Sequence, residues 1–183
     1  MVWMGSGSGD ARLDRRRLRR LAAGDRSAIA EIYDAHAARI FIHALWLTRR
    51  RHEAEDVVQS VMLKLMGMGP DLLAIRRPAA YLVRMARREA LDLIARRGEG
   101  RDTPIEEALF VADGSDPARA AEASQAGRLI DLLDPAQREA VHLHLFEGFT
   151  FREIGEITGV SIFTAASRYR IAIERMKKEV GEG

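Results

Sequence analysis

Residues 133–180 carry a sequence pattern that restricts this segment to a helix, a second short helix, a glycine turn and a long third helix. Two pairs of residues have the spacing of helix starts, with a capping residue followed three positions later by Gln or Glu. A helix presented after such a turn can enter the major groove of DNA. The pattern therefore predicts a reader of DNA or a mimic of one. The signals are Asp134-Pro135-Ala136-Gln137, Thr150 with Glu153, Gly159-Val160 for the turn, and Ser161 as the cap of the third helix.

The composition narrows the class of protein. Hydrophobic residues make up 47% of the 183 residues, which is enough for real cores, and the absence of cysteine excludes disulfides and thiolate metal sites. No apolar run approaches the roughly 18 residues of a membrane span. Residues 1–9 lack the apolar segment of a signal peptide. We therefore predict a cytoplasmic protein without membrane insertion.

The net charge of +2 hides an asymmetry along the chain. Residues 1–97 hold 19 Lys and Arg against 11 Asp and Glu, a net +8. Residues 98–130 hold 3 against 7, a net −4, and residues 131–183 hold 7 against 9, a net −2. The basic amino-terminal half suits a polyanionic partner, although a merely solvated basic surface would have the same composition.

The apolar periodicity predicts an all-α fold built from two small helical domains. Residues 1–9 read as a flexible amino terminus, with the Gly5–Gly9 repeat typical of a tag remnant. Helices are expected from Ser27 to Leu47, from His52 to Met66 and from Ala79 to Arg97. These form a domain at 10–97, and a helix-turn-helix domain occupies 118–183. A flexible acidic linker, 98–117, joins them, with a short turn at Ile105–Phe110.

The helix expected at 79–97 carries a basic outer face. If Leu82, Met85, Ala86 and Leu93 point inward, arginines point outward and Tyr81 lies at the edge. Arginines contact phosphates, and an aromatic ring can stack on an unpaired base. The alternative is a solvated surface on which long side chains cover a half-buried tyrosine. The outward arginines are Arg84, Arg87 and Arg88.

The long carboxy-terminal helix also has two faces. The spacing i, i+4, i+7, i+11 directs one set of side chains to the core, while Ser and Arg on the other face suit base edges and phosphates. A small bundle could use a similar helix merely for packing. The inward set is Ala165, Tyr169, Ala172 and Met176, and the outward set includes Phe163, Ser167, Arg170, Glu174 and Lys178.

No cofactor, metal or catalytic centre is predicted. His142 and His144 are two residues apart and would point to different sides of a helix. His36 and His43 share a face but would lie roughly 10 Å apart along the axis, too far for one zinc ion. No glycine-rich phosphate loop or nucleophile motif occurs. We therefore expect packed histidines and a protein that is not an enzyme.

Two segments together resemble the extracytoplasmic-function (ECF) group of bacterial RNA polymerase sigma factors. The first, Ile32 to Arg97, contains the run Glu53-Ala54-Glu55-Asp56-Val57-Val58-Gln59 and the run Tyr81 to Asp92; it resembles the sigma-two domain. The second contains Leu133 to Glu139, Glu147 to Gly155, Gly159-Val160-Ser161 and Ser167-Arg168; it resembles the sigma-four domain. The helix-turn-helix alone is shared with many regulators, so the first segment gives the resemblance its specificity.

The resemblance implies a role for each segment. The helix with Glu55 would dock on the clamp helices of the polymerase largest subunit, and sigma-four would also contact the flap. The loop Gly67–Pro78 and the following helix would capture and melt the −10 element, and the helix from Ser161 would read the −35 element. Implied polymerase-binding residues are Glu55, Asp56, Gln59 and Ser60; implied −10 residues are Arg76, Arg77, Tyr81, Arg84, Arg87 and Arg88; implied −35 residues are Arg152, Ser161, Phe163, Thr164, Ser167, Arg168 and Arg170.

The chain departs from the family pattern at several of these positions. Ser60 stands where Glu is usual, Tyr81 where Trp is common, and Arg88 where Asn is typical. In the third helix of sigma-four, the usual Gly, Val-Lys pair and later basic residues are replaced by Phe163, Ala165-Ala166, Ile171 and Ile173. Fewer cations weaken phosphate anchoring. An exposed Phe163 could contact a thymine methyl group or a protein.

The function expected from these features is promoter recognition, DNA melting and transcription initiation with core RNA polymerase. The expected partners are core polymerase, promoter DNA and an anti-sigma factor. One alternative is a sigma-like decoy that occupies an anti-sigma factor without initiating transcription, which the reduced basic character of sigma-four favours. A stand-alone regulator of duplex DNA is a further alternative, but it leaves the segment Glu55–Gln59 unexplained.

Overall fold

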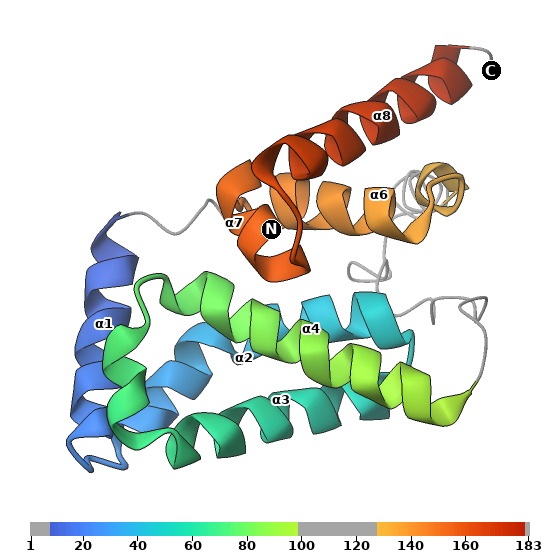
Figure 1. Cartoon of the computed structure of the whole chain (residues 1–183). Helices are drawn as coiled ribbons and strands as arrows, with labels where there is room; N and C mark the ends of the chain where they lie inside the picture. The colour runs from blue at the N-terminus through green and yellow to red at the C-terminus, as the bar shows by residue number, and fades with distance from the viewer. Residues whose placement is uncertain (1–7, 99–127, 182–183) are drawn as a thin grey trace, which may run out of the picture. The chain divides into compact units, whose positions relative to one another are not determined.

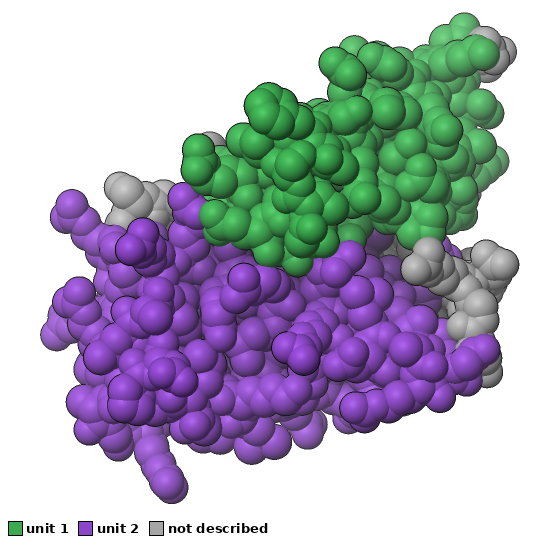
Figure 2. Space-filling view, in the orientation of Figure 1, with its two compact units in different colours: residues 1–4, 105–183 green, residues 5–104 purple. Residues whose placement is uncertain are grey.

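The computed structural model describes residues 8–98 and 128–181. Every regular element in these ranges is helical, which confirms the predicted all-α class. The chain divides into two compact units, unit 2 at residues 5–104 and unit 1 at residues 1–4 and 105–183 (Figure 2). The division lies within the segment predicted to be the acidic linker, and the turn expected at Ile105–Phe110 lies outside the described residues.

Unit 2 is built around three long helices that pack side by side (Figure 1). Its elements are α1 (Ser8–Ala22), α2 (Ala28–Thr48), α3 (Arg51–Gly67), the short 3-10 helix η1 (Gly69–Ala74) and α4 (Pro78–Arg97). Helix α1 begins at Ser8, inside the segment 1–9 that was expected to be flexible. The largest fully buried side chains of this unit are Ile32, Ile40, His43, Val57, Val61, Leu65, Leu72, Leu82 and Val83.

Helix α4 buries more than the single stripe that the sequence predicted. Leu82 and Ala86 are buried as expected, whereas Met85 and Leu93 are only half-buried. Val83 is fully buried instead. The reason is that α4 packs against both α2 and α3, so two of its faces are covered.

Proline and a left-handed glycine define the ends of α4. Pro78 occupies the first position of the helix, where a backbone N–H would have no acceptor within the helix. Gly98 ends the helix with a φ of 67°. The segment between Gly67 and Pro78 was expected to be a loop. It contains η1, which is held in place by the buried side chain of Leu72.

Helix α1 is attached to the rest of unit 2 by a buried cluster of charged and polar side chains. Arg17 donates to Asp14 Oδ1 at 2.9 Å, and His36 Nε2 of α2 lies 3.0 Å from Asp14 Oδ2. Burial alone would raise the pKa of Asp14, but the approach of His36 and Arg17 outweighs burial and lowers the pKa below its ordinary value. The ionised carboxylate therefore stabilises the fold.

We expect Asp14→Asn to destabilise unit 2 by roughly 1–3 kcal/mol near neutral pH, because it leaves buried donors without a charged acceptor. A carboxyl whose pKa is lowered on folding stabilises above its unfolded pKa, and this contribution is lost as the pH falls through the folded pKa. Urea unfolding of both proteins over a series of pH values measures this. The difference between them should shrink at acid pH, and a constant difference would contradict the assignment.

Unit 1 contains the predicted helix-turn-helix. After a helical turn at 128–131 come α6 (Pro135–Val141), the π-helical segment η3 (His142–Phe146), α7 (Phe151–Thr158) and α8 (Ile162–Gly181) (Figure 1). Leu133, Val141 and Ala172 form a buried cluster, and Tyr169, Ile173 and Met176 pack against it half-buried. The predicted inward face of α8 is therefore confirmed, with Ala165 and Ala172 fully buried.

Asp134 caps α6 as predicted, but the third position behaves differently. The Asp134 carboxylate accepts hydrogen bonds from the backbone N–H groups of Ala136 and Gln137. The Gln137 side chain does not return to the cap. Its oxygen accepts from Arg175 Nη1 of α8 at 2.9 Å, so it ties α6 to α8.

Four of the five histidines are packed within the units. His36, His43 and His142 are buried, and His144 is half-buried between the rings of Phe151 and Tyr169. His144 Nδ1 lies 2.8 Å from the carbonyl oxygen of Phe149. Within residues 8–98 and 128–181, no three His, Asp or Glu side chains lie close enough together to hold a metal ion.

Candidate nucleic-acid interface

The turn between α7 and α8 is fixed by local hydrogen bonds. Thr150 and Glu153 form a complete capping box, in which Glu153 N–H donates to the Thr150 hydroxyl at 3.3 Å and Thr150 N–H donates to the Glu153 carboxylate at 3.0 Å. Gly159 ends α7 with a φ of 76°. Ser161 then accepts from the N–H of Thr164 at 3.0 Å and starts α8. All three sequence signals therefore form the contacts that were predicted.

One face of α8 lines a groove against the start of α6. Its volume is about 560 Å³. Phe163 is 83% exposed at the start of α8, and Ile171, two turns further on, is 37% exposed. The groove brings together four of the residues predicted to read the −35 element and adds residues that the helical spacing alone did not single out. Its lining is Asp134, Ala136, Gln137, Phe163, Thr164, Ser167, Arg168 and Ile171.

The other three predicted −35 residues lie elsewhere. Arg152 on α7 and Arg170 on α8 are exposed and do not line the groove. Arg170 Nε lies 4.0 Å from the carboxylate of Glu174. The hydroxyl of Ser161 is engaged in capping α8 and in a hydrogen bond with the Thr164 hydroxyl at 2.8 Å. In this structure the Ser161 hydroxyl therefore serves to start α8.

The outer face of α4 carries the predicted arginines around Tyr81. Arg84 and Arg88 are exposed, and Arg87 is half-buried. The guanidinium of Arg84 lies over the ring of Tyr81 at 5.0 Å from its centre, and the Tyr81 hydroxyl lies 3.6 Å from the sulfur of Met68. Tyr81 is thus a half-buried, positioned ring with a cation over one face, so a base can stack on it only at the other face or after Arg84 moves.

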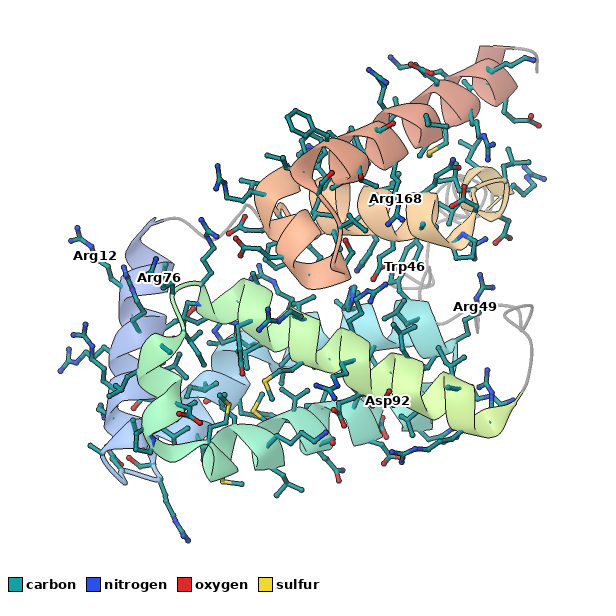
Figure 3. All side chains as sticks on the ribbon, in the orientation of Figure 1. Arg12, Trp46, Arg49, Arg76, Asp92 and Arg168 are labelled. Atoms are coloured by element: carbon teal, nitrogen blue, oxygen red, sulfur yellow. The ribbon has the colours of Figure 1, made fainter. Side chains whose placement is uncertain are left out.

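Arg76 and Arg77 lie in the short extended segment between η1 and α4, and both are exposed. Figure 3 labels Arg76 and Arg12 of α1 at the same end of unit 2. The two elements are in contact, because α1 packs against η1. Basic side chains from α1 and from the start of α4 therefore gather at one end of this unit.

The face of α3 that was predicted to bind polymerase lies beside a second groove. Glu55, Asp56 and Gln59 are exposed on α3. Glu55 and Gln59 line a groove of about 460 Å³ between α2 and α3, together with the half-exposed ring of Tyr33. The remaining lining residues are Ala37, Ala38, Phe41, Arg51 and Val58. Sequence reasoning missed the aromatic wall of this groove, which Tyr33 and Phe41 of α2 form.

Ser60 is oriented away from that groove. Its hydroxyl donates to Glu89 Oε2 of α4 at 2.9 Å, and Lys64 forms an ion pair with the same carboxylate. Burial raises the pKa of Glu89, but Lys64 and Ser60 outweigh this effect and lower the pKa below its ordinary value. Ser60 therefore joins α3 to α4 in this structure.

A further link between α3 and α4 was not predicted. Glu53, at the start of α3, pairs with Arg97 Nη1 at the end of α4 at 3.1 Å, and both side chains are largely buried. The pair joins residues 44 positions apart. It holds the first turn of α3, and with it the exposed Glu55 and Asp56, in a fixed orientation.

Both units match known protein families. Residues 32–99 match sigma-70 region 2, and residues 124–176 match sigma-70 region 4. The ferric citrate uptake sigma factor FecI of Escherichia coli K12 is 30% identical over 138 residues, which cover 70% of this chain and 79% of FecI. The chain belongs to the ECF group of the sigma-70 family.

Other relatives of this ECF sigma factor agree. The ECF RNA polymerase sigma factor SigK of Mycobacterium ulcerans is 27% identical over 170 residues, covering 87% of this chain and 89% of SigK. The sigma factor RpoE of Bartonella quintana, solved in complex with the anti-sigma factor NepR, matches with a TM-score of 0.65 and 20% identity. That match covers 83% of this chain and 96% of RpoE and supports the fold. Among the described residues, no helix is long and apolar enough to cross a bilayer.

Proposed function

We propose that this ECF sigma factor binds core RNA polymerase and directs promoter recognition, DNA melting and transcription initiation, without being an enzyme itself. The observation that carries the proposal is the presence, within the region 2 match, of one acidic and one basic face. Helix α3 exposes Glu55, Asp56 and Gln59 beside an apolar groove, while α4 exposes arginines around a positioned tyrosine. An acidic face with an apolar wall suits a protein partner, and a basic face with an aromatic ring suits unpaired DNA.

The polymerase contact is assigned to α3 and its groove. The clamp helices of the largest subunit would lie along Glu55, Asp56 and Gln59, with Tyr33 and Phe41 supplying apolar contact. Ser60 stays in the proposal only as a residue that orients α3 through Glu89. The flap would contact unit 1.

The DNA contacts are assigned to both units. Arg76, Arg77 and the face of α4 would capture the −10 element, and Tyr81 would stack on an unpaired base. Helix α8 would enter the major groove of the −35 element. Phe163, Thr164, Ser167 and Arg168, which line the protein groove between α8 and α6, would lie nearest the base edges. Residues 98–117 would run toward the active centre of the polymerase; most of them lie outside the described residues.

The test is reconstituted transcription with the cognate core enzyme, read by permanganate reactivity of thymines in the −10 region. We expect reactive thymines with the wild-type chain. Tyr81→Ala should reduce the equilibrium constant for promoter opening by about 5- to 160-fold, since base–aromatic stacking contributes about 1–3 kcal/mol. Tyr81→Trp should retain opening, and both variants should bind core enzyme normally. Failure of the wild type to bind core enzyme would refute the proposal.

A second candidate is a decoy that occupies an anti-sigma factor without opening promoters. It is favoured by the strongly exposed Phe163, by Ile171 in the same groove, and by the net −2 of residues 131–183. RpoE of Bartonella quintana, which has a similar fold, was solved with an anti-sigma factor, so an anti-sigma partner is part of either proposal. Reactive thymines in the footprint would exclude the decoy, and tight anti-sigma binding without any opening in excess core enzyme would support it.

A further inference from the structure

Helix α1 lies outside the region 2 match, which begins at residue 32, and it has two distinct faces. One face is buried against the rest of unit 2 through Asp14, Leu18 and Leu21. The opposite face exposes four arginines at the helical spacing i, i+3, i+4 and i+7, which places them in one row. We call this row the arginine stripe; its members are Arg12, Arg15, Arg16 and Arg19.

The arginine stripe has no acidic partner in the described part of the chain. The flanking arginines do, since Arg17 pairs with Asp14 and Arg20 pairs with Asp25 and Glu31. Within the stripe, Arg15 Nε donates a hydrogen bond to the carbonyl oxygen of Ala11 in the same helix. Like charges at i, i+4 spacing destabilise a helix by about 0.2–0.5 kcal/mol per pair. The fold therefore gains nothing from this row, and an anionic ligand would relieve its repulsion.

The position of the stripe indicates which anion it meets. Helix α1 packs against η1 and α4, the two elements that flank Arg76, and Arg12 lies at the end of unit 2 where the proposed −10 surface begins (Figure 3). Arg76 is exposed and also lacks an acidic partner in the described residues. The stripe and the proposed promoter-binding face are therefore continuous.

From this continuity we propose that the arginine stripe binds the phosphate backbone of promoter DNA adjoining the segment held by Arg76 and α4. The proposal rests on the proposed function. From Arg12 to Arg19 the row extends about 10 Å, which matches about three phosphates of one strand. Guanidinium groups bind phosphate oxygens in a bidentate manner. A bilayer is a poorer ligand, because the apolar side of α1, with Leu18 and Leu21, is buried in the core.

The test compares two double variants that remove the same charge from the full chain in complex with core enzyme. Arg12→Gln/Arg16→Gln removes two members of the stripe. The control, Arg26→Gln/Arg96→Gln, removes two exposed arginines outside it: Arg26 follows the end of α1, and Arg96 lies in the last turn of α4. Affinity for promoter DNA is measured across a fourfold range of salt concentration. Each lost phosphate contact reduces the salt slope by about 0.9.

We expect the stripe variant to reduce the slope by about 1.8, so that its defect is roughly tenfold larger at the lowest salt than at the highest. The control variant should keep the wild-type slope. Arg12→Lys/Arg16→Lys should also keep it, because lysine supplies the same charge to phosphate. Circular dichroism should be unchanged in all three, since every altered side chain is exposed.

Three outcomes would overturn the inference. The first is a wild-type slope in Arg12→Gln/Arg16→Gln; the second is an equal loss in the control variant. The third is a loss of affinity for core enzyme without DNA, or for vesicles of anionic lipid, confined to the stripe variant. If instead the wild-type holoenzyme fails to bind promoter DNA at all, the proposed function fails and the inference fails with it.

Discussion

Gly155→Ala is expected to destabilise the helix-turn-helix by about 1–3 kcal/mol and to weaken recognition of the −35 element, because the turn leaves no room for a methyl group. A Cβ at residue 155 would lie 2.8 Å from the backbone oxygen of Val160. The Gly155 carbonyl accepts from both Gly159 N–H and Val160 N–H, so the turn folds directly over this residue. This oxygen belongs to the backbone and cannot rotate away as the end of a side chain could. Helix α8 must therefore shift relative to α7.

The measurement is amide hydrogen exchange in α7 and α8, together with promoter binding by the holoenzyme. Gly181→Ala is a matched control in the same unit, since its Cβ would meet no atom within 4 Å. We expect faster exchange only in Gly155→Ala, with −10 opening retained on a promoter that does not depend on the −35 element. Equal protection in the two variants would show that the close approach to Val160 is not a constraint in solution.

Glu55→Lys/Asp56→Lys is expected to weaken binding to core polymerase by about 100-fold, close to 3 kcal/mol, because like charges across an interface cost several kcal/mol. Both side chains are exposed, and Glu55 forms a surface ion pair with Arg51 that contributes little to folding. The fold should therefore survive the change. Titration of labelled chain with core enzyme, without DNA, measures the loss directly.

Asp71→Lys/Asp92→Lys supplies the charge-matched control, since it reverses two exposed carboxylates of unit 2, on η1 and α4, that do not line the groove beside α3. It should leave affinity for core enzyme within about twofold of the wild type, a difference of less than 0.5 kcal/mol. Retention of core binding by Glu55→Lys/Asp56→Lys would remove α3 from the polymerase interface. Equal losses in both variants would indicate a general effect of net charge rather than a contact.

Local features were readable from the sequence. The cap at Asp134, the capping box of Thr150 with Glu153, and the turn at Gly159 each join residues at most five positions apart, so their geometry depends on little beyond the residues involved. The inward face of α8 follows equally from helical spacing, and Ala165 and Ala172 are buried as predicted. The family resemblance rested on the same short runs, and both regions match.

Long-range partners were decided only by the tertiary structure. Gln137 was placed at a capping position yet bonds Arg175, Ser60 was placed on the polymerase face yet bonds Glu89, and Glu53 pairs with Arg97. These pairs join residues 38, 29 and 44 positions apart. Helical periodicity gives the direction of a side chain from its own axis, but not the neighbouring helix that it meets. The grooves beside α3 and α8 depend on that packing, because each is lined by two helices whose separation no local pattern encodes.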